Sequence, residues 1–326
     1  MSVLKRLRYR IEWLGVLALA RGIPLLSRRG VLRLSRGLGW LAFRFDRRGR
    51  ETALQNLEAV FGSEKTESEI REIALRSFQN FARTVCDQFW SSRLSSDNFF
   101  DYCRFEYDDP EILETVRDTG AIWVTPHYGN FEWVSLGAGY LGYDFCVVTQ
   151  EFKNPLLTSF FKKNREHTGH TVIAQRGSIL RLLKHLKRGG NAAFLTDLTI
   201  PPGRAATVIE CLGRKTCVTG LHAELMKKTG VPVIPGVSIP QPDGSYVIRG
   251  LPALHFSATQ STREIAQRCW DVFEDVIRKE PEHWLWMYKH WRYKPEKDEA
   301  AYPPYANRSK KFDRLLKQIE DAESGD

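Results

Sequence analysis

The sequence lacks an apolar run long enough to cross a membrane. Within residues 11–26 the longest uncharged run, 13–20, is followed at once by Arg21, whereas a spanning helix needs about 20 predominantly apolar residues. No Ala-x-Ala cleavage pattern follows that would favour a secretory signal peptide. We therefore expect two shorter helices, over residues 5–25 and 29–45, separated at Gly22-Ile23-Pro24.

The sequence also lacks the motifs of several common enzyme classes. There is no P-loop and no dinucleotide fingerprint, and Ser135 lacks the first glycine of the Gly-x-Ser-x-Gly elbow of serine hydrolases. The six cysteines form no Cys-x-x-Cys pair and no Cys/His metal spacing. We expect no metal and no dissociable cofactor, and we expect reduced core thiols at Cys86, Cys103, Cys146, Cys211, Cys217 and Cys269.

Positive charge is concentrated in the first 50 residues. They hold 13 Lys/Arg and two acids, a sum of +11, and because the whole chain carries +9 the remaining residues sum to −2. The arginines alternate with apolar residues, as in helices that lie on a membrane surface. No nucleic-acid-binding signature is present, so nucleic acid is not an expected partner. We interpret residues 1–50 as a basic amphipathic arm on the membrane, although a shallow re-entrant anchor or a helical cap on the domain would give the same pattern.

Strands and helices alternate through most of the remaining chain, which predicts one α/β domain with a mixed, largely parallel sheet flanked by helices. We place this domain at residues 51–296. Residues 297–326 are charged and poor in apolar residues, so we expect a weakly packed tail with one helix near 308–321. Strands are expected at 121–124, 145–149, 171–174, 192–196, 207–212, 231–239 and 245–249, and helices at 51–61, from 67 onward, and at 131–140, 154–168, 178–188, 220–228 and 261–278.

The stretch from His127 to Glu132 carries the strongest catalytic signal. It follows a predicted strand and precedes a predicted helix for which Asn130 is the N-cap, at the sheet edge where α/β proteins bind ligands. The carboxylate of Glu132 can reach back to one imidazole nitrogen, which would fix the tautomer and leave the other nitrogen as a general base. The alternative is structural: a histidine that ends a strand and a glutamate favoured by the helix dipole.

Other polar residues are predicted at or near the same edge. Asp197 ends a predicted strand, where it can serve the site or only cap the next turn. Arg165 suits bidentate pairing with a phosphate, although it can equally belong to a solvated face, and Arg176 and Arg204 in strand-edge loops are weaker phosphate candidates. The aromatic and basic stretch 284–293 suits a membrane interface or packing back on the sheet.

These motifs resemble a known family. His127-Tyr128-Gly129-Asn130-Phe131-Glu132 resembles the His-x4-Glu/Asp motif of the lysophospholipid acyltransferase superfamily, and its flanking residues are most similar to the lipid A late-acyltransferase branch, with the related mannoside acyltransferases. The resemblance spans roughly residues 1–296. It also includes the segments 50–57, Asn154-Pro155-Leu156, Arg165, Asp197, Gly213, 230–235 and 284–295.

The resemblance implies a glycerolipid-acyltransferase-like fold and an O-acyltransferase. His127, oriented by Glu132, would take a proton from a hydroxyl of a lipid A precursor, which attacks a fatty acyl thioester of acyl carrier protein or coenzyme A without a covalent enzyme intermediate. Asn130, Arg165 and Asp197 would contact substrate, although Thr196-Asp197-Leu198-Thr199 lacks the second acid of many relatives.

The enzyme would then act at the cytoplasmic face of the inner membrane. Two alternatives stay open at this point. The acceptor can be a mannolipid, an ornithine lipid or a lysophospholipid, because no motif specifies its headgroup. The protein can also be a non-catalytic peripheral lipid-binding protein in which the His/Glu pair is structural.

Overall fold

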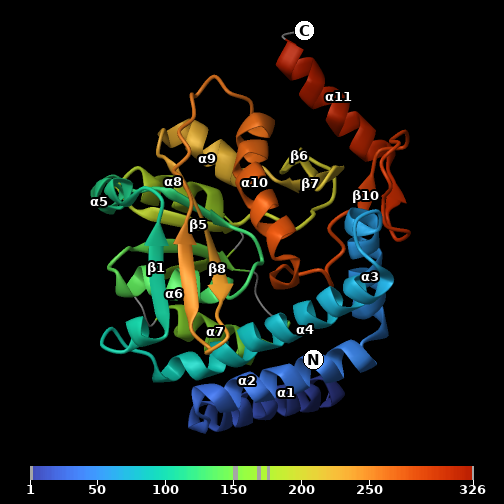
Figure 1. The fold of residues 1–326 in the computed structure, drawn as a ribbon. Helices are drawn as coiled ribbons and strands as arrows, with labels where there is room; N and C mark the ends of the chain where they lie inside the picture. The colour runs from blue at the N-terminus through green and yellow to red at the C-terminus, as the bar shows by residue number, and fades with distance from the viewer. Residues whose placement is uncertain (1–2, 150–152, 167–169, 175–176, 325–326) are drawn as a thin grey trace.

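A mixed seven-stranded sheet lies at the centre of the part of the chain that the structure describes, residues 3–149, 153–166, 170–174 and 177–324 of a computed structural model (Figure 1). The strand order is β1-β9-β8-β2-β5-β3-β4. Neighbours from β8 to β4 are parallel, β9 is antiparallel to β8, and β1 is parallel to β9. The strands are β1 (Cys103–Tyr107), β2 (Ile122–Thr125), β3 (Phe145–Thr149), β4 (Thr171–Ala174), β5 (Asn191–Leu195), β8 (Val233–Pro240) and β9 (Tyr246–Gly250).

Helices cover both faces of this sheet. Side chains of α5 and α6 pack on one face with those of β2, β3 and β8, and α8, α9 and α10 pack on the other. The predicted single α/β domain with a mixed, largely parallel sheet is confirmed, and the six cysteines are buried and free. The helices are α1 (Val3–Gly22), α2 (Arg28–Phe45), α3 (Arg47–Phe61), α4 (Glu67–Trp90), α5 (Pro110–Thr119), α6 (Phe131–Tyr140), α7 (Pro155–Glu166), α8 (Ser178–Leu186), α9 (Leu221–Thr229), α10 (Thr262–Lys279) and α11 (Lys310–Ser324).

The C-terminal residues are not the weakly packed tail that their charge predicts. Phe312 of α11 is fully buried against an antiparallel hairpin formed by β6 (Ala206–Cys211) and β7 (Arg214–Thr219). Arg214 of this hairpin donates a hydrogen bond of 2.5 Å to the carbonyl of Ala301. The expectation fails because a few apolar residues on one side of a charged helix are enough to hold it against a hairpin.

The N-terminal arm packs closely on the domain. Helix α2 lies along α4 (Figure 1), with Val31 and Phe43 among its buried residues. At Gly39 the helices approach so closely that a Cβ atom would lie 2.4 Å from the Cα of Gln79. The opposite side of the arm stays exposed, and no helix within the described ranges is both long and apolar enough to cross a bilayer.

Candidate active site

His127 lies in a tight turn just beyond the carboxyl end of β2. The turn is fixed on both sides by the segment 283–285, because Gly129 N donates to the carbonyl of His283 (2.9 Å) and Leu285 N donates to the carbonyl of His127 (3.1 Å). Gly129 has a φ of +55°, and a Cβ atom there would lie 1.7 Å from the carbonyl oxygen of Ser238. Only glycine fits this position, so the sequence determines where the imidazole is presented.

The carboxylate that holds the imidazole is that of Asp197. Its Oδ1 lies 2.7 Å from Nδ1 of His127, and its Oδ2 accepts the backbone N–H of His127 at 2.9 Å. Nε2 has no hydrogen-bond partner among the residues that the structure describes, and the His127 side chain is 11% exposed. The interpretation that gave the orienting role to Glu132 is therefore corrected: Asp197 holds Nδ1, which leaves Nε2 as the basic nitrogen.

Asp197 is buried and remains a carboxylate. Burial alone would raise the pKa of Asp197, but the charge and hydrogen bonds of His127 outweigh it and lower the pKa from 3.8 to about 2. The ionised carboxylate therefore stabilises the folded protein above about pH 4, and its contribution is lost only as the pH falls toward 2. Trp284 donates its indole N–H to Oδ2 at 2.8 Å, so this oxygen accepts two N–H groups.

The aromatic stretch 284–293 packs into the protein, which decides between its two predicted roles. Trp284, Trp286 and Trp291 are almost fully buried. Asn56, in the upstream segment that carried part of the resemblance, donates to the carbonyls of Trp286 and Tyr288, both at 2.8 Å. The stretch thus packs against Asp197 and helps to hold its carboxylate in place.

Sequence reasoning missed two functional positions in this stretch. The indole of Trp284 fixes Asp197, and His290 Nδ1 lies 3.2 Å from the carbonyl oxygen of Asp197. The His290 ring stacks on Trp284 at a centroid distance of 4.0 Å, and burial lowers the pKa of His290. The concentration of tryptophans marked the segment in the sequence, but no local pattern indicated which indole bonds to a carboxylate 87 residues away.

An apolar cavity of about 260 Å³ begins beside the turn that holds His127. It runs between α6 and the sheet, with Phe131 and Glu132 at the end near His127. Ala138 of α6, Trp123 of β2 and Phe145 of β3 line it farther from His127. A groove of about 1110 Å³ lies next to it, and the two share Val148, Phe194 and Leu195 as lining residues. The site therefore combines a basic nitrogen with a narrow apolar space and an open groove.

The other predicted site residues do not all lie together around His127. Glu132 lines the apolar cavity, and Arg204 lines the groove. Asn130 is the N-cap of α6, as predicted; it is fully buried and is not among the residues that line the cavity, and its contact with substrate stays a prediction. Arg165 lies on α7 with its side chain outside the described part of the structure, and Arg176 lies outside the described residues.

Comparisons with known proteins identify the family of this chain. The family model described as bacterial lipid A biosynthesis acyltransferase matches residues 2–293. The chain is 24% identical over 307 residues to the lipid A biosynthesis lauroyltransferase of Escherichia coli (strain K12), covering 90% of this chain and 95% of that protein. The match reaches from the N-terminal arm through the aromatic stretch, so the matched range includes His127 and Asp197.

Proposed function

The chain belongs to the bacterial lipid A biosynthesis acyltransferase family and is an acyltransferase, and on that premise we propose that it transfers a fatty acyl group from a thioester to a hydroxyl of a lipid A precursor. The observation that carries the proposal is the His127–Asp197 pair at 2.7 Å, with Nε2 unbonded among the described residues, beside an apolar cavity. A general base next to a channel for a hydrocarbon chain is the arrangement that direct acyl transfer needs.

In the proposed reaction Nε2 of His127 takes the proton of the acceptor hydroxyl while its oxygen attacks the thioester carbonyl carbon. Asp197 stabilises the imidazolium that forms. The oxyanion of the tetrahedral intermediate is stabilised by the N-terminal end of α6 or by a nearby arginine. When the carbon–sulfur bond breaks, the thiolate leaves and takes the proton from Nε2, so no acyl-enzyme forms and the base is restored.

Acyl carrier protein is the proposed donor, with coenzyme A as the alternative. The test is a transfer assay with purified protein, in which both thioesters carry the same acyl chain and the acceptor is a lipid A precursor, a mannolipid, an ornithine lipid or a lysophospholipid. We expect a product only with the lipid A precursor, and faster with the carrier protein. Transfer to another acceptor would show that the proposed acceptor is wrong and that the proposed acyl transfer is right. No transfer to any acceptor would contradict the whole proposal.

The acyl chain is proposed to occupy the apolar cavity. Ala138 lies seven residues beyond Phe131 on α6, about 10 Å along the helix axis, so it lines a deep part of the cavity. Replacing Ala138 with leucine should shift the preference to shorter donors, with a discrimination of about tenfold per methylene group. Competition between donors of different length measures the shift. Ser135→Ala, which changes the same lining without adding bulk, should leave the preference unchanged; an unchanged preference in Ala138→Leu would contradict this use of the cavity.

We further propose that the arm attaches the enzyme to the cytoplasmic face of the inner membrane as a peripheral protein. Leu4, Leu7, Ile11 and Leu14 follow helical spacing on α1 and are 54–79% exposed, and Phe45 of α2 is 74% exposed. Such apolar rows flanked by arginines suit insertion among anionic headgroups.

Replacing both Leu7 and Ile11 with aspartate should weaken binding to anionic lipid vesicles at least about tenfold, because two apolar side chains no longer leave water. Vesicle flotation measures the binding. Ala322→Asp on the exposed surface of α11, far from α1 (Figure 1), is the matched control. Equal flotation of both variants and the wild type would exclude the arm as the attachment surface.

A further inference from the structure

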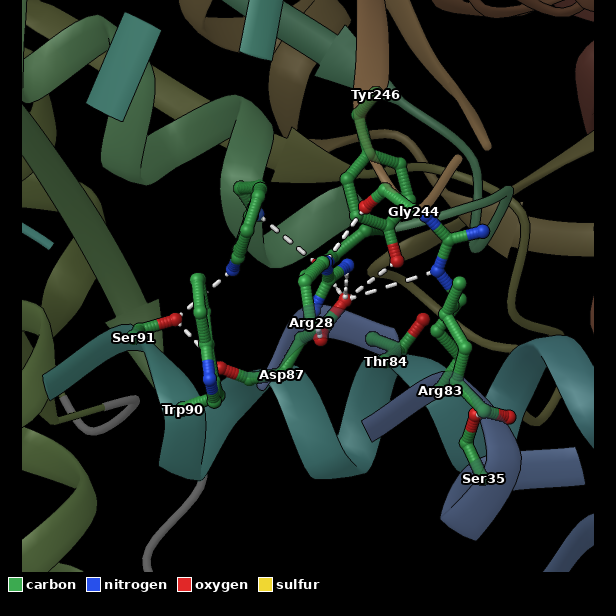
Figure 2. Close-up of polar contacts among 12 residues, drawn as sticks. Arg28, Ser35, Arg83, Thr84, Asp87, Trp90, Ser91, Gly244 and Tyr246 are labelled. Atoms are coloured by element: carbon green, nitrogen blue, oxygen red, sulfur yellow. Dashed lines mark hydrogen bonds and ion pairs between the residues drawn. The ribbon is translucent and has the colours of Figure 1, made fainter. Parts of the chain in front are cut away.

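A buried polar network joins Arg28 of the N-terminal arm to Asp87 and Tyr246 (Figure 2). Asn130 connects this network to residues 127–130, which we call the catalytic turn. We name the network the arm-to-turn network and define it as Arg28, Asp87, Asn130 and Tyr246. Arg28 is the first residue of α2, Asp87 lies on α4, Tyr246 begins β9, and Asn130 caps α6. Four elements far apart in the sequence therefore meet around one carboxylate.

Asp87 is the centre of this network and is completely buried. It accepts hydrogen bonds from both terminal nitrogens of Arg28, with Nη2 at 3.0 Å from Oδ2. Oδ2 also accepts the hydroxyl of Tyr246 at 2.5 Å and the side-chain amide of Asn130 at 3.2 Å. A carboxylate removed from water needs all of these donors, so the position of each partner depends on the others.

Arg28 is held in a single orientation. Its guanidinium lies 5.1 Å from the ring centroids of both Trp90 and Trp133, and 5.7 Å from that of Tyr246, and its Nε donates to the carbonyl of Gly244 at 2.6 Å. Burial alone would lower the pKa of Arg28, but the hydrogen bonds and the charge of Asp87 together have the larger effect. The pKa of Arg28 is therefore raised above its usual value. Trp133 belongs to the first turn of α6, so the arginine of the arm also touches the helix that follows the catalytic turn.

Asn130 transmits this constraint to the site. Its Oδ1 accepts the backbone N–H of Trp133 at 3.2 Å and thereby caps α6, while its Nδ2 donates to Asp87. One helical turn earlier on α4, Thr84 donates its hydroxyl to the carbonyl of Gly129 at 2.9 Å. Helix α4 therefore holds Gly129 and Asn130, two of the three residues between His127 and α6, at two separate points.

A buried ion pair is seldom the most stable choice for such a position. Apolar side chains of similar volume often stabilise a fold as well or better, whereas a charged and hydrogen-bonded group specifies one arrangement. Here the ion pair and its hydrogen bonds fix the position of the N-cap of α6 relative to α4 and to the arm. This is the part of the molecule that must be accurate within a fraction of an ångström for general-base catalysis.

We propose that Arg28 and Asp87 are positioning residues that set the catalytic turn through Asn130, so that the N-terminal arm is part of the active-site framework as well as a membrane attachment. This inference rests on the proposed function, because it concerns the same His127. It predicts that a change in the arm–α4 contact alters the chemical step and leaves acceptor binding unchanged.

The sharpest test is Asn130→Ser in the full-length protein. Serine caps a helix about as well as asparagine, but it cannot provide the amide donor to Asp87. We expect kcat per folded molecule to fall about 10- to 100-fold with the KM for the acceptor unchanged, because the turn is displaced relative to the substrate. A kcat equal to that of the wild type would overturn the inference, since capping alone would then explain Asn130.

Arg28→Gln tests the far end of the network. It should lower kcat in the same way, and Arg28→Lys should recover only part of the loss because lysine lacks the two-pronged geometry. Arg50→Gln is the matched control, because Arg50 donates to the carbonyls of Phe43 (2.7 Å) and Arg44 (2.8 Å) within the arm. A loss of stability without a loss of kcat in both Arg28→Gln and Arg50→Gln would give Arg28 a purely structural role and overturn the inference.

The double variant Arg28→Gln/Asn130→Ser separates coupling from two independent effects. Both changes act through Asp87, so the combined loss in kcat should be smaller than the product of the single losses. If the loss in kcat of the double variant equals the product of the two single losses, the two residues act independently, which would contradict coupling through Asp87. The wild type is measured first with the acyl thioester and the lipid A precursor: no turnover there contradicts the proposed function, whereas turnover with an unchanged Asn130→Ser contradicts only the positioning inference.

Discussion

Replacing His127 with alanine is expected to reduce acyl transfer about a thousandfold while the protein stays folded and bound to vesicles. General-base catalysis by a positioned side chain contributes about 10²- to 10⁴-fold. Within the described part of the chain no other imidazole bonds to the carboxylate of Asp197, because His290 contacts only its backbone carbonyl. Turnover of purified protein with the thioester and the lipid A precursor measures the loss.

The matched control for this prediction is His255→Ala, because His255 is exposed in the segment after β9. It should retain the wild-type rate. If His127→Ala kept turnover within tenfold of the wild type, the imidazole would not be the base, and the peripheral lipid-binding interpretation would gain support.

Replacing Asp197 with asparagine is expected to cost about as much, roughly 10³- to 10⁴-fold. Oδ2 of the carboxylate accepts two N–H groups, from the His127 backbone and the Trp284 indole. An asparagine must keep its oxygen there, which turns its NH₂ group toward Nδ1 of His127. Nδ1 then becomes an acceptor, the proton moves to Nε2, and the nitrogen that faces substrate is no longer a base.

The same experiment distinguishes Asp197 from Glu132. Nitrogen chemical shifts of His127 report which ring nitrogen carries the proton. We expect Asp197→Asn to change the tautomer and Glu132→Gln to leave it unchanged, because it is Asp197 whose carboxylate lies 2.7 Å from Nδ1. A tautomer that responds to Glu132→Gln and not to Asp197→Asn would restore the interpretation drawn from the motif alone.

Much of the fold followed from local patterns in the sequence. The run 121–124 is short, apolar and bounded by Gly120 and Pro126, so it read as a buried strand, and β2 occupies Ile122–Thr125. A helix is predicted from residue 67 onward, and α4 begins at Glu67 with a capping box of Thr66 and Glu69. The edge strand β1 was not predicted, although Cys103–Tyr107 alternates apolar and charged residues as a strand exposed along one side does.

The pairing at the active site was beyond local patterns. The sequence placed His127 and Asp197 each at a strand end, but the order of strands in a sheet is a long-range property. In the structure β2 and β5 are neighbours and Thr125 pairs with Leu195, so residues two positions beyond each strand meet. Glu132, five positions from His127, is the nearest acid in the sequence, but the acid that contacts the imidazole in the structure is Asp197.

The central claim is tested most directly in the host, by comparing intact lipids by mass spectrometry after the gene is deleted and then restored as the wild type or as His127→Ala. We predict that deletion removes one acyl increment from lipid A, that the wild type restores it, and that His127→Ala does not. Lipid A whose mass is unchanged by deletion, or whose missing chain is restored by His127→Ala, would contradict the account.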